Sequence, residues 1–337
     1  MTLSTTALQA ESYIEPEVYR RECAELFNGS WLLLGHQSEL KNDGDAIVRT
    51  VAGFPFVIAN SEGSLRGFLN ICPHRAGPLL WEGNHHELKG FRCRYHGWSY
   101  DWDGRLTRAP DFGASCPDLQ LSKVAVAVRS GLIFCNTDPQ APEAELDRQL
   151  SPLFEELSAR GVEHFGQHHY ESHELKCGWK TYAENYLEGY HIPYLHPGLM
   201  KGIRMGSYRV AVQQRVVTHH VDTRESSVSD GYWAFAWPNL AVNIYESGLS
   251  LERIIPLACN RTRIEYIYLF PQNASEETRQ SVISTSDTIT REDILICEAV
   301  QQNLETRTYV AGPLSPKHEN GLQAFHQWWR AALGVIQ

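Results

Sequence analysis

The stretch FRCRYHGWSYDWDG, residues 91–104, places a soft metal ligand, Cys93, three positions before an imidazole, His96. A tryptophan-rich segment follows and turns at Asp103-Gly104, a dipeptide typical of tight β-hairpins. The pair therefore lies on a loop that leads into a hairpin. Cysteine alone is often a small buried hydrophobe, but a cysteine and a histidine at matched spacing are more typical of a metal site.

A second stretch, NICPHRAGPL at residues 70–79, supplies Cys72 and His74 with one residue between them. Together the two stretches offer two thiolates and two imidazoles, which could hold zinc tetrahedrally or a [2Fe-2S] cluster in which histidine replaces cysteine on one iron. Cys-x-His is tighter than the usual spacing of zinc ligands, but it lets each loop give one sulfur to one iron and one nitrogen to the other. The pattern therefore favours the iron–sulfur cluster.

The overall composition narrows the class of protein. The chain has 337 residues, of which 42% are hydrophobic and 21% charged, as expected for a globular protein of about two domains. A formal net charge of -10 provides no basic patch for phosphates and argues against nucleic acid as a partner. No apolar run reaches the roughly 20 residues of a membrane span, and the N-terminus lacks the features of a signal peptide. We expect a cytoplasmic protein with no membrane partner.

The predicted elements divide the chain into three parts and indicate an α+β fold. Residues 1–30 contain an amphipathic helix, predicted at Glu15–Asn28, that we expect to pack on the C-terminal domain. Residues 31–150 hold short β-rich runs with Gly, Pro and Asn turns, which predict a small antiparallel β domain around the two Cys–His pairs. Residues 151–337 predict a larger antiparallel sheet flanked by helices. Those helices are expected at Trp179–Tyr190, about Ser275–Thr308 and near Glu319–Leu333.

A second candidate site lies in GWKTYAENYLEGYHIPYLHPGL, residues 178–199. Glu188 and His191 are three residues apart and would share a helix face. Pro193 is expected to end the helix near His191, and Pro197 biases His196 toward an extended conformation. The chain can then fold back and bring the two imidazoles together as a metal pair.

A non-haem Fe(II) that activates O2 uses two histidines and one carboxylate, so a third ligand is needed. The segment SDTITREDILICEAVQQNLE, residues 286–305, is predicted to be helical. Asp293 lies near the centre of its apolar stripe, whereas Glu292 is on the order of 90° away. The stripe consists of Ile289, Ile296, Cys297, Val300 and Leu304. A buried carboxylate needs a partner, which could be Fe(II), an arginine or backbone groups.

The two Cys–His stretches resemble the halves of the Rieske domain of ring-hydroxylating and related non-haem iron oxygenases. REDILICEAVQ, residues 291–301, is similar to the iron-binding region of the branch that contains choline and carnitine monooxygenases. The resemblance implies a [2Fe-2S] cluster on one set of residues and a mononuclear Fe(II) on another. The first set is Cys72, His74, Cys93 and His96, and the second is His191, His196 and Asp293.

Glu188 stands where most members of this family have aspartate. The resemblance implies that its carboxylate links His96 of one subunit to His191 of the next in a ring-shaped homotrimer, so that electrons pass between subunits. A metal-bound histidine commonly donates its second N–H to such a carboxylate.

The resemblance implies the terminal component of a mono- or dioxygenase system that hydroxylates or oxidatively demethylates a small organic substrate with O2. No Gly-x-Gly-x-x-Gly motif or plant-type cysteine cluster is present, so a separate ferredoxin or flavin reductase must deliver the electrons of NAD(P)H. Two alternatives stay open. A Rieske electron carrier would need only the first domain, and a zinc-binding interaction module would contain no iron.

Four aromatic residues are candidates for the substrate pocket. Trp233, Phe235 and Trp237 alternate on one strand face, and Tyr245 follows on the next strand. Such a face is more often core than pocket. If it lines a cavity, it could stack on an aromatic substrate or surround a quaternary ammonium group through cation–π contacts.

Overall fold

The computed structural model describes residues 6–112, 118–224 and 227–335. The chain forms two compact units. The small unit consists of residues 28–145, and the large unit combines residues 1–27 with residues 146–337. The boundaries predicted after residues 30 and 150 lie close to these. No helix in the described ranges is long and apolar enough to cross a membrane.

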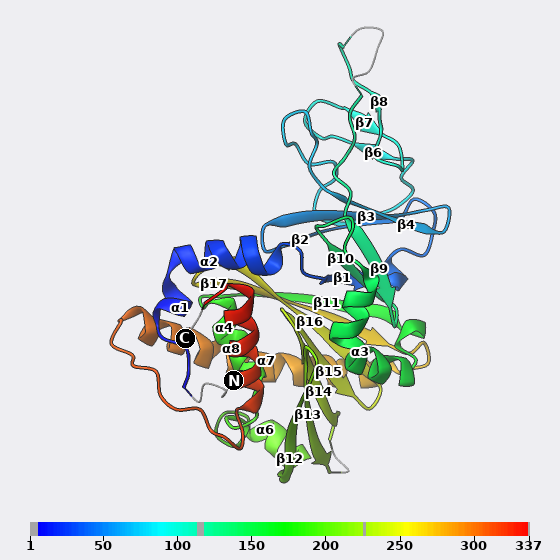
Figure 1. Ribbon diagram of the computed structural model, residues 1–337. Helices are drawn as coiled ribbons and strands as arrows, with labels where there is room; N and C mark the ends of the chain where they lie inside the picture. The colour runs from blue at the N-terminus through cyan, green and yellow to red at the C-terminus, as the bar shows by residue number, and fades with distance from the viewer. Residues whose placement is uncertain (1–5, 113–117, 225–226, 336–337) are drawn as a thin grey trace. The chain divides into compact units, whose positions relative to one another are not determined.

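The small unit is built from short antiparallel strands (Figure 1). Its sheets have the strand orders β4-β3-β2-β5, β6-β7-β8 and β1-β10-β9. The elements are β1 (Leu32–His36), the 3-10 turn η2 (Gln37–Glu39), β2 (Ala46–Val51), β3 (Phe54–Ser61), β4 (Ser64–Leu69), β5 (Gly83–His85), β6 (Phe91–Arg92), β7 (Ser99–Tyr100), β8 (Leu106–Arg108), β9 (Ala125–Arg129) and β10 (Leu132–Asn136). A hydrophobic core that includes Phe68, Leu79 and Trp98 buries both Cys72 and Cys93.

The large unit contains one antiparallel sheet of seven strands in the order β11-β17-β16-β15-β14-β13-β12. The strands are β11 (Gly166–Leu175), β12 (Ile203–Gln213), β13 (Val216–Thr223), β14 (Ser229–Ala236), β15 (Leu240–Tyr245), β16 (Gly248–Ala258) and β17 (Arg261–Phe270). The helices are α1 (Glu11–Ile14), α2 (Pro16–Arg21), the π-helix η1 (Glu22–Phe27), α3 (Glu143–Ala159), the 3-10 turn η3 (Val162–His164), α4 (Trp179–Tyr186), α5 (Ile192–Leu195), α6 (Pro197–Gly202), α7 (Glu276–Glu305) and α8 (Asn320–Ala332). The predicted α+β class is confirmed.

The predicted N-terminal helix is α-helical only in α2 and continues as the π-helix η1. Its Glu22 is buried and accepts hydrogen bonds from Nε1 of Trp179 at 2.8 Å and Nε1 of Trp329 at 2.6 Å. The same carboxylate pairs with the buried ammonium group of Lys180. A single ionised group therefore joins η1 to α4 and α8, and it fixes the N-terminal segment within the large unit.

The predicted end of the helix near His191 is wrong. Helix α4 ends at Tyr186, and Pro193 lies in the first turn of the short helix α5. Pro197 likewise begins α6. Proline is tolerated at these positions because the first N–H groups of a helix have no acceptor within it. Both histidines consequently lie in the links between short helices.

Helix α7 matches the predicted segment, but its buried face is more polar than predicted. Asp293 is buried as expected, whereas Ile296 and Val300 are each 39% exposed. The buried side includes Thr290, whose hydroxyl lies 2.8 Å from that of Tyr266 on the sheet. The helix therefore meets hydroxyl-bearing residues of the sheet, and an apolar stripe alone does not describe its contacts.

Candidate metal centres and active site

The two Cys–His pairs lie together in the small unit. Cys72 and Cys93 are free and buried, and the partly buried residues His74 and His96 have ring centroids 4.6 Å apart. The ring of His74 stacks on Trp98 at 4.4 Å, and its Nδ1 is buried without a hydrogen-bond partner. An unsatisfied imidazole nitrogen beside a second imidazole and two free thiols fits the four ligands of a histidine-containing [2Fe-2S] centre.

The two loops that carry these pairs approach one another closely. A Cβ atom on Gly77 would lie 2.8 Å from Cβ of Tyr95 and 3.0 Å from Sγ of Cys93, so only glycine fits without displacement. The hydroxyl of Tyr100 lies 3.0 Å from Sγ of Cys72. Hydrogen bonds to the sulfurs of such a centre tune its reduction potential.

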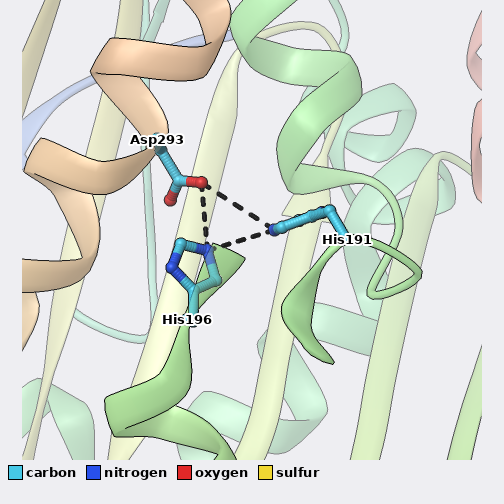
Figure 2. A group of neighbouring side chains, drawn as sticks. All are labelled: His191, His196 and Asp293. Carbon is cyan, nitrogen blue, oxygen red and sulfur yellow. Dashed lines mark hydrogen bonds and ion pairs between the residues drawn. The ribbon is translucent and has the colours of Figure 1, made fainter. Parts of the chain in front are cut away.

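His191, His196 and Asp293 meet in the large unit (Figure 2). Nε2 of His191 lies 3.2 Å from Nε2 of His196, and Oδ1 of Asp293 lies 3.1 Å from the latter and 3.8 Å from the former. His196 is fully buried. The amide of Asn185 donates a hydrogen bond of 2.7 Å to Oδ1 of Asp293 and orients that carboxylate.

Each imidazole of this triad is held from behind by a further carboxylate. Nδ1 of His191 lies 2.6 Å from Oε1 of Glu188, and Nδ1 of His196 lies 2.7 Å from Oε2 of Glu292. Glu188 also accepts from the backbone N–H groups of Tyr190 and His191, which makes it the cap of the turn before α5. Since both Nδ1 atoms face acceptors, both rings carry the proton there and present Nε2 as a lone-pair donor.

These distances fit a divalent metal ion. Ligand atoms at right angles around an ion with bonds of about 2.1 Å lie about 3 Å apart. Two imidazole lone pairs and a carboxylate oxygen that converge at 3.1 to 3.8 Å repel one another unless a cation lies between them. Burial lowers the pKa of His196, but the carboxylates of Asp293 and Glu292 outweigh burial and raise it overall, so the site attracts positive charge.

A cavity of about 410 Å³ adjoins the triad. Trp233 and Tyr245 line it, together with the three triad residues. Phe235 and Trp237 do not line it, although they alternate with Trp233 in the sequence; Trp237 follows the end of β14. Their rings pack 5.7 and 5.4 Å from that of Phe325, because α8 covers this part of the sheet.

Sequence reasoning missed two acids of this site. The helical pattern predicts that Glu292 lies away from the buried stripe of α7. The side chain of Glu292 nevertheless reaches His196, and within the described residues it is the only acid paired with Nδ1 of His196. Sequence reasoning did not single out Glu252, which lies in the strand LSLERIIPL and lines the cavity. An acid inside an otherwise apolar strand is the feature that could have pointed to it. Asn185 is a further residue of the site, and its amide group supports Asp293.

Comparison with protein families decides the identity of the fold. A model of the "Ring hydroxylating alpha subunit (catalytic domain)" matches residues 162–228 and 205–334, and a model of the "Rieske [2Fe-2S] domain" matches residues 30–125. The chain belongs to the ring-hydroxylating oxygenase alpha subunits. The predicted family and enzyme class are thereby confirmed. The Rieske domain carries a [2Fe-2S] cluster, and the catalytic domain implies a mononuclear iron. A catalytic domain also separates this oxygenase from the electron carrier and the zinc module considered above.

Relatives of this alpha subunit differ in substrate. Choline monooxygenase from Arabidopsis thaliana is 26% identical over 89% of this chain and 76% of its own length. A solved quaternary ammonium Rieske monooxygenase described for carnitine oxidation superimposes with a TM-score of 0.88 at 24% identity, over 97% of this chain and 95% of its own. Naphthalene 1,2-dioxygenase from Rhodococcus sp. gives a TM-score of 0.80 at 17% identity, over 97% and 94% of the two chains. The fold is therefore shared by enzymes for cationic and for aromatic substrates.

Proposed function

We propose that this alpha subunit hydroxylates or oxidatively demethylates a small organic substrate in the cavity beside the triad. The observation that carries the proposal is the set of two imidazoles and one carboxylate, each imidazole fixed by a further acid, at the wall of a cavity of about 410 Å³. We assign Fe(II) to His191, His196 and Asp293, and the cluster to Cys72, His74, Cys93 and His96. A bound ferrous ion supplies O2 activation at this place, and the cluster supplies single electrons.

The protein side chains would position and shield this chemistry. The ligand atoms are kept aimed at one point by Asn185, Glu188 and Glu292. Apolar surface of the cavity wall comes from Ile192 and Trp233. We further propose that Glu188 bridges to a Rieske histidine of a neighbouring subunit in a homotrimer. A ferredoxin or flavin reductase would supply the electrons, and the protein would be cytoplasmic. The support for these points is the family relationship.

Iron quantitation and oxygen uptake test the proposal together. The purified protein is expected to hold about three irons per chain, two in the cluster and one at the triad. Asp293→Ala should retain only the cluster iron and lose substrate-dependent O2 uptake, whereas Gln302→Ala, on an exposed part of the same helix, should retain both. Incorporation of ¹⁸O from labelled O2 into product counts the atoms transferred. A wild-type protein with cluster iron alone and no O2-dependent product would contradict the proposal.

A further inference from the structure

Glu252 is a buried acid of the cavity wall that the proposed chemistry does not use. Glu252 lies on β16, opposite Ala241 of β15 and Tyr266 of β17, and it is 1% exposed to solvent. Its Oε1 is buried and has no hydrogen-bond partner within the described residues. The side chain nevertheless lines the cavity that the triad adjoins.

The other buried acids of the described ranges all have charged or titratable partners. Glu22 pairs with Lys180, Glu39 with Arg49, Asp45 with His86 and Glu265 with Arg253, while Asp293 belongs to the triad. Glu252 has no ion pair within the same ranges. A buried carboxylate without a charged partner is costly to keep in a fold. We therefore expect the positive charge that balances Glu252 to come from a ligand bound in the cavity.

The side chains of Tyr182, Tyr266 and Asn243 lie within hydrogen-bonding reach of the Glu252 carboxyl group, but none of them is charged. The hydroxyls of Tyr182 and Tyr266 lie 3.2 Å from each other, and that of Tyr266 lies 2.8 Å from Thr290 Oγ1. Burial raises the pKa of Glu252 to about 7, although these hydroxyls lower it. A positive charge placed beside the carboxylate would favour its ionised form.

The other residues that line the cavity favour a cationic ligand. Aromatic side chains surround the space: Tyr182, Tyr186, Tyr232, Trp233, Tyr245 and Tyr266. Ring faces attract a cation, and a carboxylate among them adds a full charge. Lys201 is the lysine of this lining, and it is exposed on α6. A quaternary ammonium ion satisfies the rings but has no N–H group for the unpaired Oε1, whereas a protonated amine satisfies both.

We propose that Glu252 determines substrate specificity by accepting a hydrogen bond from a protonated primary, secondary or tertiary amine, whose neighbouring carbon faces His191, His196 and Asp293. This inference rests on the proposed function, because it names the substrate class of the same cavity. Glu252 is thus a substrate-binding residue, and the triad is the reacting centre.

The test compares matched ligands on the anaerobic holoenzyme by isothermal titration calorimetry. N,N-dimethylbenzylamine and N,N-dimethylethanolamine are the protonated amines. Benzyltrimethylammonium and choline are their quaternary analogues, and isobutylbenzene and 3-methylbutan-1-ol are their uncharged carbon isosteres. In the wild type, at least one amine should bind more than about 10-fold more tightly than both of its analogues.

Glu252→Gln keeps the shape of the side chain and removes its charge. The variant should bind that amine roughly 10- to 100-fold more weakly, with binding of the carbon isostere and iron content unchanged. Glu277→Gln, which removes an exposed acid of α7, is the control and should leave all affinities unchanged. The proposal is overturned if no amine of the set exceeds its isostere, if the quaternary ion binds most tightly, or if Glu252→Gln binds the amine as the wild type does.

The two proposals fail in different ways. If the specificity assignment is wrong, Glu252→Gln still holds triad iron and still couples O2 uptake to product with the true substrate. If the oxygenase assignment is wrong, the triad holds no iron and O2 is not consumed, whatever Glu252 binds.

Discussion

Oε2 of Glu292 lies 2.7 Å from Nδ1 of His196, on the side of the ring opposite the other two triad residues. This contact fixes which nitrogen of His196 is free to bind a metal. Glu292→Ala should weaken iron binding at the triad by roughly 10- to 100-fold, because it removes the acceptor that holds the ring. Glu292→Gln should lose less, since its amide oxygen can still accept. Iron content after dialysis against a weak chelator measures this, and equal retention by Glu292→Ala and wild type would disprove the role.

Glu188→Gln should separate iron binding from electron delivery. The amide oxygen of glutamine can replace Oε1 and still accept from the ring N–H of His191, although its NH2 group cannot accept from the backbone N–H groups that Oε2 binds. Both iron centres should therefore stay loaded. Product formation should nevertheless fall strongly, because the variant lacks the charge that the bridging proposal requires. Single-turnover oxidation of the reduced cluster, followed by its visible absorbance, is the measurement. Glu188→Asp should restore much of the rate, and full activity in Glu188→Gln would refute the bridge.

Tyr100→Phe should lower the reduction potential of the cluster. The hydroxyl lies 3.0 Å from Sγ of Cys72, where a hydrogen bond stabilises the more negative, reduced state. Loss of one hydrogen bond corresponds to a decrease on the order of 50 mV for a one-electron couple. Redox titration of the cluster absorbance tests this. Thr107→Val, which removes an exposed hydroxyl that donates to the carbonyl of Ser99 and not to a sulfur, serves as the control. An unchanged potential in Tyr100→Phe would rule out the effect.

Lys180→Met should strongly destabilise the large unit. Its ammonium group is buried against Glu22, and removing it leaves an uncompensated carboxylate that keeps its hydrogen bonds from two indole N–H groups. Removing one partner of a buried pair typically costs about 3–5 kcal/mol. Chemical denaturation followed by tryptophan fluorescence measures the loss. The double variant Glu22→Gln/Lys180→Met should recover part of it, and a single variant as stable as wild type would show that the pair is dispensable.

The residues of the two proposed metal sites were more predictable than those of the cavity, for a physical reason. Cysteine and histidine at short spacing on loops, and an acid near the centre of a helical stripe, are local patterns, and the structure brings those residues together. Which part of the sheet α8 covers is set by long-range packing, which the sequence does not show. The sequence therefore could not distinguish Trp233, which lines the cavity, from Phe235 and Trp237, which pack against α8. The position of Glu252 depends likewise on three adjacent strands.

The pH dependence of the free energy of unfolding should reveal the raised pKa of Glu252. Burial raises its pKa to about 7 from about 4.5 in the unfolded chain, so the folded state binds this proton more tightly than the unfolded state. Stability contributed by the neutral acid is therefore present below pH 4.5 and is lost as the pH rises toward 7. The difference amounts to at most about 3 kcal/mol.

Glu252→Gln removes this dependence, because glutamine stays neutral. In protein stripped of the triad iron, urea denaturation should show the variant more stable than wild type by up to about 3 kcal/mol at pH 8, and nearly equal to it at pH 4.5. An acid that lowers stability at neutral pH is expected where function requires it. Parallel stability curves for the two proteins would show instead that Glu252 is already compensated in the folded chain, and they would remove the physical reason for a cationic ligand.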